Sequence, residues 1–156
     1  MIAPLASLMH RVEHHSRTTG QSLDEAAAIV VDDLERAAAA LSARTAPLVP
    51  ACGVLVAVAG LMLKAEPASD PVSEVFLGLA ILSAVGALWF LTRAHFAYVG
   101  RRNVGLAPTV DDIAFTHRRL VRKHADAHRG GWLAGIGLTC LVLGILFGVH
   151  ISLNTG

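Results

Sequence analysis

Histidines and basic residues in two short stretches are the side chains best suited to chemistry. His10, Glu13 and His14 form the pattern H-x-x-E-H, which has the letters of a zinc-protease signature. Two histidines four residues apart share one helix face, but no third ligand and no enzyme domain surround them. His124 and His128 are also one helical turn apart and could bind a metal or titrate together. We expect all four to be surface histidines, and no metal site is predicted.

The second stretch is strongly basic, and its arginines follow the spacing of a helix. Arg118, Arg122 and Arg129 are four and seven residues apart, with Arg119 and Lys123 beside them. Guanidinium groups match phosphate oxygens, so one interpretation is a phosphate-binding site. The alternative is contact with anionic lipid headgroups, worth about 1 kcal/mol for each basic residue near a membrane surface. Because the chain has no glycine-rich phosphate loop and no complete catalytic set, we expect no enzyme and no cofactor.

The elements that must position these residues are membrane helices. Of the 156 residues, 54% are hydrophobic and 16% are charged, which is too apolar for an average soluble domain. Apolar stretches near 47–63, 75–98 and 131–153 approach or exceed the roughly 20 helical residues that cross a bilayer. A polar turn at 64–73 joins the first two into a hairpin. We therefore predict an all-α membrane protein with three transmembrane helices, a hairpin plus a C-terminal span.

The distribution of basic residues predicts how these spans are oriented. Residues 1–46 contain four Arg, residues 93–130 contain eight Lys and Arg against three acidic residues, and the hairpin turn contains one Lys. By the positive-inside rule, the N-terminus and the second connection are cytoplasmic. The centres of the spans lack charged residues, which disfavours a transporter or proton pump. The basic stretch is short and adjoins a membrane, which disfavours nucleic-acid binding.

Two cytoplasmic helices are expected within residues 1–46, separated at Gly20. Ser22 with Glu25 three residues later is typical of a helix start. After it, apolar residues recur at steps of four and three, which is the spacing of a surface for a partner helix. That surface either packs on the protein's own cytoplasmic helix or joins two copies of the chain. Its members are Leu23, Ala27, Val30, Leu34, Ala37 and Leu41.

Further helix boundaries follow from caps and breakers. Pro47 should break or kink the chain where it meets the membrane domain, which we place at 47–153. A loop at 100–108 precedes Thr109 and Asp112, which should cap a basic cytoplasmic helix near 109–129. Gly130 and Gly131 should then interrupt this helix or give a flexible start to the third span.

Glycines in the third span predict close helix packing. Gly131 and Gly135 are four residues apart, as are Gly144 and Gly148, and Gly137 is seven before Gly144. They serve packing within one chain or oligomerisation in the membrane. Three short spans enclose little core, so we favour a homo-oligomer with contacts at these glycines and at Leu34 and Leu41.

The order of these parts resembles the small transmembrane effectors of Pycsar anti-phage defence, from about Leu34 onward. The similarity is carried by the acidic start at 111–114, the basic run at 117–124 and Gly131-Trp132-Leu133. The family often has Asp-x-Lys-Ala before its first span. This chain has Ala43-Arg44-Thr45-Ala46 there and lacks both charges.

The resemblance implies a protein of the bacterial inner membrane that responds to a cyclic pyrimidine mononucleotide, cyclic UMP or cyclic CMP, and then impairs the membrane. One phosphate would suit Arg118, Arg122 and Lys123, and Phe115 could stack on the base. The expected partners are therefore this nucleotide, membrane lipid and further copies of the chain. The alternative function is a non-enzymatic accessory or structural subunit of a larger membrane complex.

Overall fold

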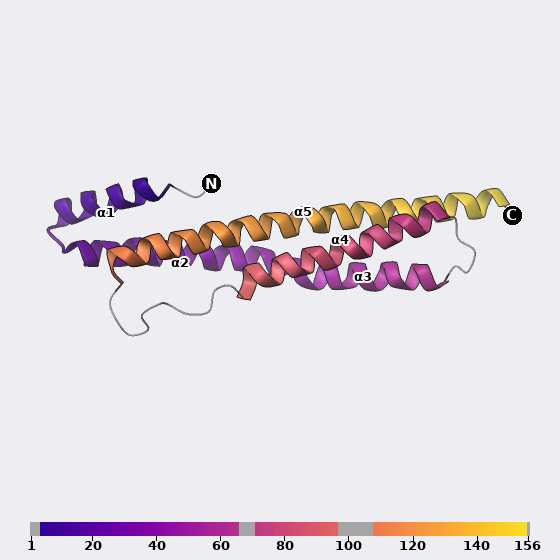
Figure 1. Cartoon of the computed structure of the whole chain (residues 1–156), viewed down its shortest axis with the longest axis horizontal. Coiled ribbons are helices and arrows are strands. Elements are labelled where there is room, and N and C mark those ends of the chain that lie inside the picture. Colours follow the sequence, from indigo (N-terminus) through magenta and orange to yellow (C-terminus); the bar gives the residue numbers. More distant parts are fainter. Residues whose placement is uncertain (1–3, 66–70, 97–107, 156) are drawn as a thin grey trace. The chain divides into compact units, whose positions relative to one another are not determined.

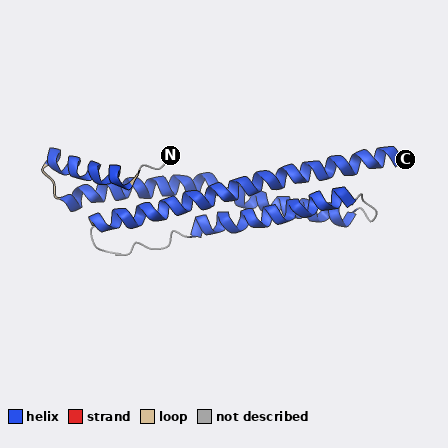
Figure 2. Ribbon diagram, turned by 45° about the horizontal axis from the view of Figure 1, so that its top comes forward, coloured by secondary structure: helices blue, strands red, loops and turns tan. Residues whose placement is uncertain are grey.

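The protein is all-α, as the sequence predicts. The computed structural model describes residues 4–65, 71–96 and 108–155, and this part of the chain is helical apart from short turns and contains no strand (Figure 2). The helices are α1 (Leu5–Thr19), α2 (Leu23–Thr45), α3 (Leu48–Ala65), α4 (Pro71–Phe96) and α5 (Val110–Thr155) (Figure 1). The loop predicted at 100–108 lies largely outside the described residues, as do the middle of the hairpin turn and the expected end of the second span at 97–98.

Local signals in the sequence define the helix ends. Gly20 has a φ of 67°, the left-handed conformation that favours glycine, and its N–H donates to the carbonyl of Ser16 at 3.0 Å. The N–H of Ser22 then donates to the Glu25 carboxylate at 3.0 Å, and the N–H of Glu25 donates to the Ser22 hydroxyl at 3.2 Å. This reciprocal pair is the predicted capping box and begins α2. The N–H of Thr109 likewise donates to Asp112 at 2.9 Å, where α5 begins.

The helices pack as two compact units, one with residues 1–44 and 94–125 and one with residues 45–93 and 126–156. In the first unit, α1 lies along the N-terminal half of α2 (Figures 1 and 2), and Leu8 and Val12 are its buried residues. The core of this unit joins α1, α2 and the first part of α5. Its buried members are Leu8, Val12, Ala26, Ala27, Val30, Val31, Leu34, Ala38, Ile113 and Leu120.

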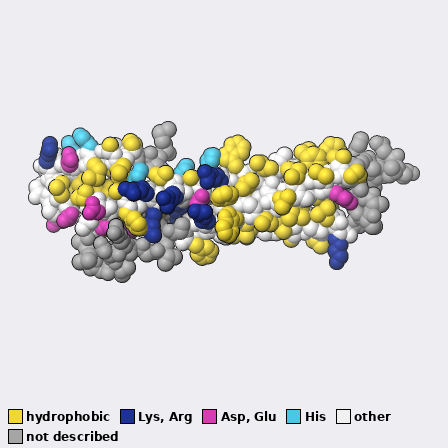
Figure 3. Space-filling model, in the orientation of Figure 1, with side chains coloured by type: hydrophobic (Ala, Val, Ile, Leu, Met, Phe, Trp, Pro, Cys, Tyr) yellow, Lys and Arg dark blue, Asp and Glu magenta, His cyan; other side chains and the backbone are white. Residues whose placement is uncertain are grey.

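The second unit contains α3, α4 and the remainder of α5. Three alanines of α4, Ala80, Ala84 and Ala87, have no exposed surface, so neighbouring helices approach its backbone closely. Large apolar side chains remain exposed on all three helices, among them Leu61 and Leu82 at 67% and 71%, and Figure 3 shows hydrophobic side chains over much of the visible surface of this unit. Such an apolar exterior suits a lipid environment.

Three helical stretches of the described chain are long and apolar enough to cross a membrane: Leu23–Lys64, which contains most of α3, together with α4 and α5. On α4, the exposed side chains of Glu74 and Arg93 are 19 residues apart, which corresponds to about 28 Å of helix and matches a hydrocarbon core of about 30 Å. The protein is therefore a multi-pass membrane protein.

One expectation about the third span is wrong. The sequence predicts an interruption or flexible start at Gly130 and Gly131, but α5 is one continuous helix of 46 residues through both. The reason is that Gly130 serves close packing. A Cβ built on it would lie 2.8 Å from Cγ of Leu91, so the position needs a residue without a side chain. The break before α3 is present, since Ala46 and Pro47 form a turn between α2 and α3.

Candidate functional site

The basic stretch forms the N-terminal part of α5, and it presents its two central arginines to solvent. Arg118 and Arg122 are exposed and four residues apart. With about 100° per residue, their side chains leave the helix within about 40° of each other. The pair therefore offers two guanidinium groups on one face, as expected of a contact with phosphate groups.

Phe115, the residue predicted to stack on a base, is half-buried and already has a partner. The guanidinium carbon of Arg119 lies 4.5 Å from the centre of its ring. This is a cation–π contact between residues one helical turn apart. A ligand ring could use only the other face of Phe115, or would have to displace Arg119.

Lys123 does not lie with the two arginines. Its side chain is only 4% exposed, and its ammonium group donates a hydrogen bond to the hydroxyl of Ser42 on α2. Ser42 in turn donates to the carbonyl oxygen of Ala38 at 3.1 Å. Burial lowers the pKa of Lys123 because the charged ammonium loses hydration. Lys123 thus links α5 to α2 inside the first unit, whereas Arg118 and Arg122 face outward.

The glycines predicted to mediate association divide into two groups. Gly144 packs within the chain, since a Cβ there would lie 3.1 Å from the Leu77 side chain of α4. Gly131 and Gly135 have open space where a Cβ would be, and they line an open groove of about 640 Å³ on α5. Gly148 is half-buried. Among the glycines predicted to mediate association, Gly131 and Gly135 therefore have room for a second helix.

Spacing in the sequence could have identified the glycines that contact α4 more fully. Gly130, Gly137 and Gly144 recur every seven residues, and an added Cβ on each would meet atoms of α4 within 3.2 Å. The heptad repeat is the signal for such a helix pair. Gly137 and Gly144 were predicted to pack closely, whereas Gly130 was predicted to interrupt the helix or to give a flexible start to the third span.

The two leucines predicted for oligomer packing lie in α2. Leu34 is 7% exposed and belongs to the core that α2 forms with α1 and α5, so it packs within the chain. Leu41 is half-buried. The buried surface of α2 is shifted from the predicted heptad, because Leu23 is 51% exposed and Ala38 is buried where Ala37 was expected.

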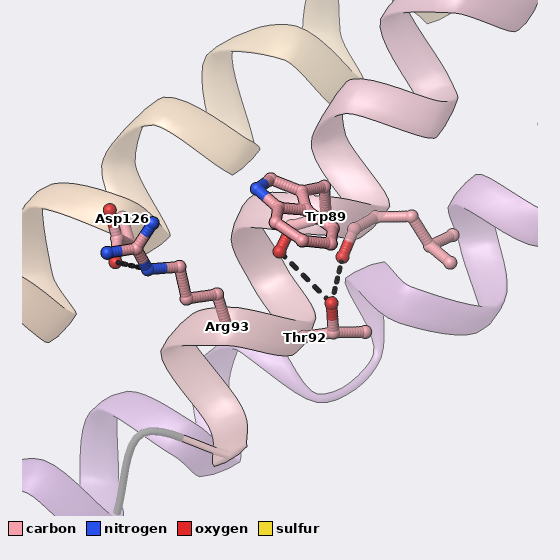
Figure 4. A network of polar contacts seen from close by, with 5 residues as sticks. Trp89, Thr92, Arg93 and Asp126 are labelled. Atoms are coloured by element: carbon pink, nitrogen blue, oxygen red, sulfur yellow. Dashed lines mark hydrogen bonds and ion pairs between the residues drawn. The ribbon is translucent and has the colours of Figure 1, made fainter.

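A polar and aromatic cluster that sequence analysis missed lies where α4 ends within the second unit. Nε of Arg93 on α4 lies 3.5 Å from a carboxylate oxygen of Asp126 on α5, and Figure 4 shows this ion pair. The hydroxyl of Thr92 beside it donates to the carbonyl oxygens of Leu88 and Trp89 at 2.7 and 3.0 Å.

Aromatic rings accompany these charges. Trp89 and Trp132 are each 66% exposed, and Arg129 lies 6.0 Å from the ring centre of Phe90. Tryptophan and arginine together at one end of a span are typical of the interface between membrane and water. In the sequence, Trp89 and Trp132 lie near the ends of apolar stretches, and this position could have indicated the interface between membrane and water.

The histidines do not assemble a metal centre in the described residues, where no group of three or more His, Cys, Asp or Glu could hold a metal ion. The rings of His10 and His14 are stacked with centres 6.4 Å apart. Nε2 of His128 accepts a hydrogen bond from the Trp132 indole at 3.3 Å.

No protein family, curated protein or solved structure matches this chain. Its function must therefore be argued from its own residues. These residues provide a multi-pass helical membrane unit, a second helical unit with two outward-facing arginines, and one helix, α5, that runs through both.

Proposed function

We propose that this protein is a non-enzymatic effector of the bacterial inner membrane, which binds a cyclic pyrimidine mononucleotide and then perturbs the membrane in anti-phage defence. The observation that carries the proposal is the continuity of α5. Its first part packs on α2 through Ile113 and Leu120, and its later part is the third span. A ligand that changes how the first part packs thereby acts on a helix that also crosses the membrane.

The ligand would have to favour one packing of the first unit over another, because only differential binding shifts a conformational equilibrium. The buried ammonium of Lys123 and its partner Ser42 provide a contact that differs between packed and separated helices. Separating α2 from α5 rehydrates Lys123 and returns its pKa toward the ordinary value. The free-energy difference between the packed and the separated arrangement of α2 and α5 thus includes the cost of burying one charge.

The distribution of charge supports a cytoplasmic position for the first unit. Segment 93–130 has eight Lys and Arg, and the chain N-terminal to the first span has four Arg. A cyclase product made in the cytoplasm would reach this unit, where Arg118 and Arg122 are exposed and are candidates for contact with its phosphate.

Self-association would proceed through the open face of α5. Gly131 and Gly135 leave the helix backbone uncovered along the groove, and such small residues let two membrane helices approach closely. Replacing Gly135 with Leu should reduce cross-linking between copies. Replacing Gly53 of α3, which is equally open, serves as the matched control.

Calorimetry tests the ligand directly. The full chain, purified in detergent, is titrated with cyclic UMP and cyclic CMP, and with cyclic AMP and cyclic GMP as controls. The proposal predicts saturable binding of one pyrimidine nucleotide at micromolar concentration or below. Absence of binding by a helical, monodisperse protein would contradict it and would favour an accessory subunit, whose partners a pull-down from the native membrane would recover.

A further inference from the structure

A pocket of about 310 Å³ lies between α1 and α2 in the first unit, away from the basic stretch. Its lining includes two apolar residues of α2, Ile29 and Val30. His10, Arg11 and His14 of α1 and Asp33 of α2 line its polar rim. This volume is at the lower end of the range for small-molecule sites, about 300–1,000 Å³.

The backbone around the pocket is held in place independently of its polar side chains. Val12 is 1% exposed and Leu8 is 5% exposed, so these two residues dock α1 on α2. The hydroxyl of Ser16 donates to the carbonyl oxygen of Gln21 at 2.8 Å across the turn at Gly20. The pocket is therefore formed before any ligand arrives.

The rim groups suit a ligand that carries a phosphate group, a planar ring and a hydrogen-bond donor. A guanidinium fork matches phosphate oxygens, and a carboxylate accepts from N–H or O–H groups. In the described part of the chain, neither Arg11 nor Asp33 makes a hydrogen bond or ion pair with another side chain, so both are available.

The two imidazole rings could bind the planar part of such a ligand. The His10 and His14 rings are inclined by 21° with centres 6.4 Å apart. This distance is shorter than the roughly 7 Å that two van der Waals contacts of about 3.5 Å need around an inserted ring. Both histidines are exposed, so their side chains can turn apart to admit a planar ring.

We infer that this α1–α2 pocket, rather than the outward-facing Arg118 and Arg122, is where the protein binds its ligand, a mononucleotide whose phosphate contacts Arg11 and whose base stacks on His10 and His14. The nature of the ligand rests on the proposed function; the position of the site rests on the pocket. Val30 lines the pocket and also belongs to the core shared with α5, so an occupied pocket acts directly on that core.

The experiment compares matched variants of the full chain in detergent, titrated calorimetrically with cyclic UMP and cyclic CMP. R11A removes the proposed phosphate contact and R17A, an exposed arginine on the same helix, is its control; R118A/R122A removes the other candidate. R11A should weaken binding by at least about tenfold, the usual worth of a charge-assisted hydrogen bond, with R17A and R118A/R122A near wild type. Loss of binding in R118A/R122A with normal binding in R11A would overturn the pocket.

A second probe separates failure of the pocket from failure of the proposed function. Phenyl phosphate carries a phosphate and a planar ring but no pyrimidine, and imidazole carbon–proton NMR signals report on His10 and His14. If neither cyclic nucleotide binds but phenyl phosphate shifts both signals in wild type and R17A and not in R11A, the pocket stands and the proposed ligand is wrong. If no probe shifts these signals in folded protein, the pocket is refuted.

Discussion

Gly130 and Gly131 are adjacent on α5 but have opposite surroundings, and this contrast predicts how alanine affects each. A Cβ at Gly130 would lie 2.8 Å from Cγ of Leu91 and 3.3 Å from the carbonyl oxygen of Ala87. Leu91 is 1% exposed and has little room to move. A Cβ at Gly131 meets nothing within 4 Å.

The magnitudes follow from two opposing effects. Replacing glycine by alanine inside a helix gains up to about 1 kcal/mol in helix propensity, and both variants share this gain. Overpacking a buried contact costs about 1–3 kcal/mol, and only G130A incurs it. We therefore expect G130A to be less stable than G131A by about 1–3 kcal/mol, with G131A at least as stable as wild type.

The assay is unfolding of the purified protein in mixed micelles of dodecyl maltoside and increasing dodecyl sulfate, followed by far-ultraviolet circular dichroism. The midpoints of G130A, G131A and wild type are compared in one series. Equal midpoints for the two variants, or a lower midpoint for G131A than for G130A, would refute the packing of α5 on α4 through Gly130.

Three further predictions test other parts of the structure. S73A removes the hydrogen bond that the Ser73 hydroxyl donates to the Gly144 carbonyl at 2.9 Å. It should lower stability in the same unfolding assay by about 0.6 kcal/mol, the average for such bonds between membrane helices. No change in the unfolding midpoint would mean that this bond contributes nothing to stability. Because burial lowers the pKa of Lys123, the unfolded chain holds the Lys123 proton more tightly than the folded protein does, so stability should rise as the pH rises toward the ordinary pKa of 10.5. K123M should lack this rise. Equal slopes of stability against pH for K123M and wild type between pH 7 and about 10 would contradict the burial of the Lys123 ammonium. In a background without the native cysteines, a membrane-impermeant maleimide should label K64C from outside intact cells and R118C only after lysis, and the reverse pattern would overturn the proposed orientation.

Much of the fold could be predicted from the sequence because its signals are local. Three apolar stretches of the right length indicate the spans, and Ser22 with Glu25 begins α2 with the expected pair of hydrogen bonds. At the start of α5, the N–H and the hydroxyl of Thr109 both donate to the Asp112 carboxylate. Such caps depend on residues three apart, so a sequence contains all the information needed.

The candidate site was harder to predict because it depends on which face of each helix is buried. Lys123 was predicted to contact a phosphate together with Arg118 and Arg122, yet its position on α5 faces α2, where Ser42 accepts its hydrogen bond. Glycine was taken as a helix breaker at Gly130, although there it permits contact with Leu91. Asp33 and Arg11 are 22 residues apart, and only the turn at Gly20 brings them to one pocket. These relations are set by tertiary packing.

Release of a fluorescent dye from liposomes that contain the purified full chain tests the proposed membrane-perturbing function most directly. We expect cyclic UMP or cyclic CMP to trigger release, cyclic AMP and cyclic GMP not to do so, and liposomes without the protein to stay sealed. Liposomes that stay sealed after a pyrimidine nucleotide is shown to bind would contradict a membrane-perturbing effector. Release that is independent of any nucleotide would contradict a ligand-controlled one.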